Sequence, residues 1–193
     1  HLDDGVWSCA GLMYKARQND CRVDMITVHT GNSKEEKLPK LQRKEVTKKG
    51  SLELRKKEDE AAAKILNINV YWWDYPTRLL RKPWLRKRLD VFNTPIYDSI
   101  TKAPQYTDIE QQITQLTDNY PEAVLLCPMG VGNMYDHVEL FAACINVGLN
   151  KNHLHQMFFY EDSYAILTGP RKEHFLLKEY VWDKKNAPER TSL

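Results

Sequence analysis

Two hydrophobic patterns alternate along the chain: short apolar runs, and longer segments with apolar residues on one face. The short runs, rich in β-branched and aromatic residues, predict strands at residues 21–31, 67–73, 123–128 and 157–160. Segments of good helix formers predict helices at residues 8–19, 52–66, 107–119 and 137–149, with Thr107 as a candidate N-cap. A further edge strand is expected at residues 176–182. Because helices and strands alternate, the pattern predicts an α/β fold whose mostly parallel sheet is covered on both faces.

Polar, lysine-rich sequence separates some of these elements. Residues 31–51 show no hydrophobic period, which predicts a long loop or lid. Basic residues gather at 34–57 and again at 78–88, where a tryptophan lies among them. These clusters are typical of a solvated surface, and they would also suit an anionic, phosphate-bearing ligand.

Length and composition narrow the class of protein. A chain of 193 residues suits one α/β domain, and we expect residues 1–193 to form a single domain. The formal net charge of +2 is too small to indicate a nucleic-acid partner, and no apolar run approaches the roughly 20 residues that cross a bilayer. The four cysteines lack a CxxC pair and predict buried thiols of a reducing compartment, here the cytoplasm. They are Cys9, Cys21, Cys127 and Cys144.

Titratable side chains are concentrated in two short segments at predicted helix starts: HLDD at residues 1–4 and YDH at residues 135–137. Loops in these positions gather at one edge of a doubly wound sheet, so we expect the two segments to meet. They would supply two imidazoles and a carboxylate for a divalent ion, and a second carboxylate to accept a proton from water. These groups are His1, His137, Asp4 and Asp3. Each segment alone is more typical of a helix N-cap or a hydrogen-bonded surface histidine.

Four segments then resemble the motifs of one enzyme family. HLDDGVWSCAG and PMGVGNMYDH are similar to the first and second motifs of the PIG-L/LmbE-like zinc-dependent N-deacetylases. RKKEDEAAAKIL resembles that family's RxxE helix, and FFYEDSYA resembles one of its strand ends. The resemblance implies a Rossmann-like, three-layer αβα fold whose first strand ends at the HLDD motif. We therefore expect that the given sequence lacks this first strand.

The resemblance also implies roles for individual residues. Zn²⁺ is the expected cofactor, with another divalent ion as the alternative. The implied metal ligands are His1, Asp4 and His137, and the implied general base is Asp3. Arg55 and Asp74 fall on positions that contact substrate hydroxyls in sugar-processing members.

One position departs from the family pattern. The first histidine of the family's HxDH motif, which supports the oxyanion or protonates the leaving amine, is Met134 here. A thioether neither donates that hydrogen bond nor carries the proton. The implied catalytic Asp136, which normally orients that histidine, is left to turn toward the metal shell. Another proton donor is then needed, and sequence alone does not place the candidates His29, His153 and His155.

The leading hypothesis is a hydrolase that removes an acetyl group from an N-acetylated amino sugar such as N-acetylglucosamine, or from a similar acetamido compound or glycoconjugate. The alternative is an impaired family member that binds a sugar or metal without efficient turnover, because of Met134. A nucleotide-binding α/β domain is disfavoured because no GxGxxG follows a predicted strand. The oligomeric state stays open.

Overall fold

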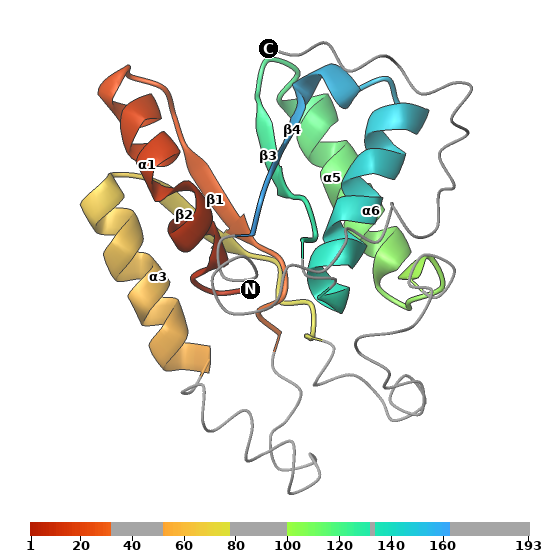
Figure 1. The fold of residues 1–193 in the computed structure, drawn as a ribbon, viewed down its shortest axis with the longest axis horizontal. Helices are drawn as coiled ribbons and strands as arrows, with labels where there is room; N and C mark the ends of the chain where they lie inside the picture. The colour runs from red at the N-terminus through yellow and green to blue at the C-terminus, as the bar shows by residue number, and fades with distance from the viewer. Residues whose placement is uncertain (32–51, 78–99, 132–133, 163–193) are drawn as a thin grey trace, which may run out of the picture.

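A computed structural model describes residues 1–31, 52–77, 100–131 and 134–162 of the chain (Figure 1). The helices in these ranges are α1 (Asp4–Gln18), α3 (Leu52–Leu66), α5 (Tyr106–Asn119) and α6 (Tyr135–Asn150). The strands are β1 (Asp24–Thr27), β2 (Asn69–Trp72), β3 (Leu125–Pro128) and β4 (Met157–Tyr160), and a short 3₁₀ helix, η4 (Leu154–Gln156), precedes β4. Every predicted strand and helix in the described ranges is therefore present.

The described strands form two parallel pairs, which confirms the mixed α/β class. β1 pairs with β2, Asp24 lying opposite Asn69, and β3 pairs with β4, Leu125 lying opposite Met157. Helices α1 and α3 lie on one side of the strands, and α5 and α6 lie on the other (Figure 1). Gly31 extends the first pair: its N–H donates to Tyr75 O at 2.9 Å, and a Cβ there would collide with Asp74 O. Only glycine permits this close approach.

Two hydrophobic clusters support this arrangement. The larger one joins α5, α6, β3 and β4, and its centre includes the fully buried Ile109 and Val138. The smaller one lies between α1, β1 and β2 and contains Cys9, Met13 and Met25. Helix α6 is buried around most of its circumference, so the polar side chains in its first turns are enclosed as well. A functional site at this enclosed helix start would be shielded from bulk water.

The observed helix starts correct three predictions. α1 begins at Asp4 rather than at residue 8, so the HLDD segment forms the helix start itself. α6 begins at Tyr135, two residues before the predicted start. The predicted N-cap Thr107 is wrong: α5 begins at Tyr106, whose side chain is buried, and Gln105 occupies the cap position. Helix ends are the least certain part of an element, because the first turn is fixed by local contacts as well as by sequence pattern.

One cysteine also differs from expectation. Cys9, Cys127 and Cys144 are buried and free, as predicted, but Cys21 is exposed. It lies in the connection after α1, where its Sγ donates to Asn19 O at 3.6 Å instead of packing in a core. The predicted edge strand at residues 176–182, the loop at 32–51 and the basic segment at 78–88 lie outside the described residues. Among the helices described, none has the length and apolar content needed to cross a membrane.

Candidate metal centre and active site

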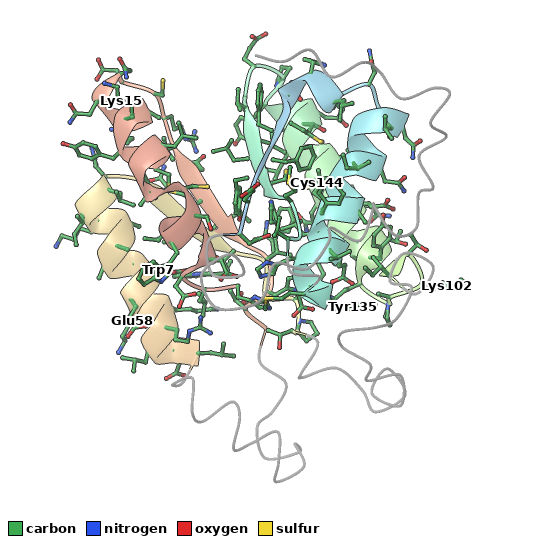
Figure 2. The ribbon with its side chains drawn as sticks, in the orientation of Figure 1. Trp7, Lys15, Glu58, Lys102, Tyr135 and Cys144 are labelled. Atoms are coloured by element: carbon green, nitrogen blue, oxygen red, sulfur yellow. The ribbon has the colours of Figure 1, made fainter. Side chains whose placement is uncertain are left out.

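The starts of α1 and α6 bring together the two titratable segments of the sequence. His1 Nδ1 lies 3.1 Å from Asp4 Oδ2 and 3.1 Å from His137 Nε2. His137 Nε2 lies 3.0 Å from the same Asp4 oxygen. Three donor atoms from two distant segments therefore converge on one point. Tyr135, labelled in Figure 2, marks the start of α6, the helix that carries His137.

This donor set fits a divalent metal ion. Ligand atoms around a tetrahedral zinc ion, with bonds of about 2.0–2.1 Å, are separated by roughly 3.3 Å. The separations here are 3.0–3.1 Å, slightly shorter. Two imidazole nitrogens and one carboxylate oxygen are also the donor types that zinc accepts, with a position left for water or substrate.

Carboxylates hold the outer nitrogens of both imidazoles. His1 Nε2 lies 2.9 Å from Asp136 Oδ2, and His137 Nδ1 lies 2.8 Å from Asp162 Oδ1. Asp162 also accepts the backbone N–H of Gly130 at 3.1 Å through its other oxygen. Carboxylate partners of this kind fix the ring orientation and tautomer of a metal-binding histidine. In this structure Asp136 therefore supports His1, a candidate metal ligand, whereas in the family pattern it orients the histidine at the position of Met134.

Sequence reasoning assigned no role to Asp162, although it lies in the FFYEDSYA segment. The available signal was its position two residues after β4, where the carboxyl ends of parallel strands gather functional side chains.

The close contacts govern the protonation of the site when no ion is bound. Burial by itself would lower the pKa of His1, but hydrogen bonds to Asp136 and Asp4 raise it to about 9. Burial likewise opposes the rise in the pKa of His137, which Asp162 and Asp4 bring to about 9. Burial would raise the pKa of Asp4, yet both imidazoles hold it well below its usual range. A metal ion that binds here would displace protons from the imidazoles.

Asp3 occupies the N-cap position of α1 without acting as a cap. Its side chain makes no capping hydrogen bond, and its backbone is left-handed, with φ 73°. The carboxylate is half exposed and lies 3.1 Å from Arg55 Nη2. The usual role of an aspartate before a helix therefore does not account for Asp3.

The two predicted substrate contacts lie in different surroundings. Arg55 adjoins Asp3 and also donates to Leu2 O at 2.7 Å. Asp74 follows the end of β2, where its Oδ1 accepts from Thr30 Oγ1 and Lys56 Nζ, each at 2.7 Å. The structure thus brings Arg55 to the candidate base and joins Asp74 to a separate polar group at the strand end.

A hollow beside the three converging atoms is lined by residues of both halves of the chain. Its polar lining includes His1, Asp4, His29, Asp136, His137 and Asp162. The rings of His29 and His1 have centroids 5.9 Å apart, and His29 Nε2 lies 3.6 Å from the buried Glu139 carboxylate. The other two candidate proton donors lie elsewhere: His153 pairs with Asp118 at 3.1 Å, and His155 lies beside His153. Met134 directly precedes α6.

Solved structures of deacetylases share this fold. A deacetylase of teicoplanin biosynthesis, solved as a complex with bog, is 22% identical, with a TM-score of 0.72 over 89% of this chain and 69% of that one. The zinc-inhibited form of teicoplanin deacetylase is 22% identical, with a TM-score of 0.72 over 89% of this chain and 68% of that one. The A40926 pseudoaglycone deacetylase is 16% identical, with a TM-score of 0.66 over 89% of this chain and 64% of that one. The chain spans about two thirds of the length of these proteins.

The parallel strands and flanking helices therefore have the α/β arrangement of these deacetylase structures. The family model PIG-L, described as GlcNAc-PI de-N-acetylase, matches residues 1–148. The chain belongs to the PIG-L family. A comparison with curated protein sequences gave no significant match.

Proposed function

We propose that the protein is a metal-dependent N-deacetylase, with Zn²⁺ as the expected ion. Its substrate would be an N-acetylated amino sugar, such as N-acetylglucosamine, or an acetamido group on a glycoconjugate. The observation that carries the proposal is the convergence of His1 Nδ1, Asp4 Oδ2 and His137 Nε2 within 3.1 Å of one another. Family membership over residues 1–148 supports the same reaction.

Each of the site residues has a separate role in the proposed reaction. His1, Asp4 and His137 would hold the ion, which when bound lowers the pKa of water and polarises the acetyl carbonyl. Asp3 accepts the proton that the attacking water loses, and Arg55, 3.1 Å away, orients its carboxylate. Asp136 and Asp162 keep the two imidazoles in the orientation that ligation requires.

Collapse of the tetrahedral carbon needs a proton donor for the leaving amine. Met134 supplies none. We infer that His29 donates this proton, since it lines the hollow beside His1, whereas His153 and His155 lie elsewhere. The C–N bond breaks, and its electron pair stays on nitrogen together with the proton from protonated His29. Asp3 then releases its proton to solvent, and solvent reprotonates the His29 imidazole.

The second candidate function is a binding protein that holds a metal or sugar without efficient turnover. The observation that favours it is Met134, which stands directly before α6 where the family pattern has a histidine. Loss of one such catalytic group typically costs about 100- to 1000-fold in rate.

Acetate release from a panel of N-acetylated sugars separates the two functions, with Asp3→Ala as the control. We expect release by the wild-type protein, loss of release in Asp3→Ala, and loss after chelation with recovery on adding Zn²⁺. Elemental analysis of protein purified without chelator should find a divalent ion. Its absence would refute the metal centre, and bound metal with no acetate release would favour the binding protein.

We also propose that residues 1–193 act as a single domain in the cytoplasm, with no nucleic-acid partner. The buried free thiols of Cys9, Cys127 and Cys144 support a reducing compartment. Limited proteolysis should leave one protected fragment that contains both hydrophobic clusters, and two separately stable fragments would contradict the single domain.

A further inference from the structure

A buried carboxylate on α3 lies directly behind the candidate base. Asp59 and Ala63 are the buried residues of this helix, and the Asp59 side chain is only 2% exposed. Its Oδ1 accepts the backbone N–H of Asp3 at 2.9 Å, and its Oδ2 accepts the Thr27 hydroxyl at 3.3 Å. Burial of a carboxylate is costly unless such donors compensate it, so an apolar residue would fill this helix position at lower cost. The charge therefore calls for an explanation beyond packing.

The peptide between Leu2 and Asp3 is held at both of its polar ends by α3. Arg55 Nη2 donates to the carbonyl oxygen of Leu2 at 2.7 Å, while Asp59 accepts the N–H of Asp3. Arg55 and Asp59 are four positions apart, so they project from the same face of the helix. One turn of α3 thus fixes the orientation of a single peptide unit.

That peptide needs to be fixed because Asp3 is strained. Its φ of 73° is in the left-handed region, which a residue other than glycine occupies only when its surroundings impose it. The peptide unit lies between His1 and Asp4, so its orientation determines where the Asp3 carboxylate lies relative to the three converging donor atoms. An error of about 1 Å in such an arrangement can cost on the order of 100-fold in rate.

We propose that Asp59 is a positioning residue of the active site, which acts through the Asp3 N–H to hold the candidate base in place. The proposal rests on the proposed function for its effect on catalysis. Its structural part, the bond from the Asp3 N–H to Asp59, is independent of catalysis and can be measured in protein without substrate.

The test compares two substitutions that differ in hydrogen-bonding capacity. Asp59→Asn keeps a carbonyl oxygen for the Asp3 N–H, and its amide can donate to the Thr27 hydroxyl. Asp59→Leu removes both acceptors. We expect Asp59→Leu to lower kcat about 10- to 100-fold with little change in KM or zinc content, and Asp59→Asn to stay within about threefold of wild type. Glu60→Leu, at an exposed position of the same helix, is the matched control.

Hydrogen exchange of the Asp3 amide gives the second readout. We expect Asp59→Leu to speed this exchange at least tenfold while amides in α5 and α6 keep their protection, and Asp59→Asn to preserve protection at Asp3. If Asp59→Leu does not fold, Asp59→Ser, whose hydroxyl is too short to reach the amide, replaces it. Unchanged Asp3 exchange in the Leu or Ser variant overturns the proposal, as does unchanged kcat. Inactive wild-type protein with the expected exchange changes would count against the proposed function, while the positioning of Asp3 would stand.

Discussion

Asp162→Asn tests the support behind the candidate metal ligand His137. For His137 Nε2 to bind a metal, Nδ1 must carry the ring proton, and Asp162 Oδ1 lies 2.8 Å from that nitrogen. The other Asp162 oxygen accepts the N–H of Gly130 at 3.1 Å. Asparagine has nearly the same shape but only one acceptor oxygen, so it can serve only one of these two donors. Either the imidazole or the glycine then faces an amide NH₂ group.

The magnitude follows from the burial of the contact. The side chains of His137 and Asp162 are 5% and 3% exposed, so water compensates little for the lost bond. Loss of a carboxylate behind a metal-binding histidine typically weakens metal affinity 10- to 100-fold, about 1.4–2.8 kcal/mol. If the glycine N–H loses its partner instead, the free energy of unfolding of the metal-free protein falls by about 1–3 kcal/mol.

Two measurements separate these outcomes. Competition with a chromophoric chelator gives the Kd for Zn²⁺, and denaturant unfolding of the metal-free protein gives its stability. Asp118→Asn is the matched control, because Asp118 also pairs with a histidine, His153, at 3.1 Å, but its side chain is 60% exposed. We expect no change in zinc affinity for the control. A Kd for Asp162→Asn within threefold of wild type, with unchanged stability, would refute the role assigned to Asp162.

Three further predictions follow from the site and the core. His29→Ala should lower kcat on an N-acetylated sugar about 100-fold or more, and it should lower kcat less on an activated acetyl ester, whose leaving group needs no proton donor. Adding Met134→His to this variant should restore part of the lost kcat, and the control His155→Ala should leave kcat unchanged. Zn²⁺ at 100 times its Kd should raise the free energy of unfolding by about 2.7 kcal/mol, and His137→Ala should remove this increase in a thermal or denaturant melt. Ile109→Ala, at a fully buried position of α5, should lower the free energy of unfolding by about 2–5 kcal/mol in denaturant titrations; a loss below 1 kcal/mol would contradict the packing described.

The sequence predicted the elements better than their boundaries. The helix at residues 52–66 and the strand at residues 157–160 were predicted with the bounds observed, because their composition changes sharply at both ends. The α1 start was missed, because its first turn carries polar residues whose positions are set by contacts with α3 and α6, not by local preference. Local sequence carries no information on those contacts.

The same distinction applies to the site. His1, Asp4 and His137 were predictable because each adjoins an element start, and parallel topology brings such starts together. Asp59 was not, because in a run of charged helix residues its sequence context is that of an exposed side chain, and only packing against Asp3 and Thr27 buries it. His29 lies within a strand-like run, where nothing local distinguishes a site residue from a core residue.

The separation in sequence between the converging donors affects the energetics of the whole chain. His1 and His137 are 136 positions apart, and they belong to portions of the chain that contribute mainly to different hydrophobic clusters. An ion held by both would cross-link these portions much as a disulfide does, and would restrict the unfolded chain to conformations in which a very long loop is closed. Ion binding would then couple the unfolding of the α1–α3 portion to that of the α5–α6 portion, so that the two clusters melt in one transition when the ion is bound.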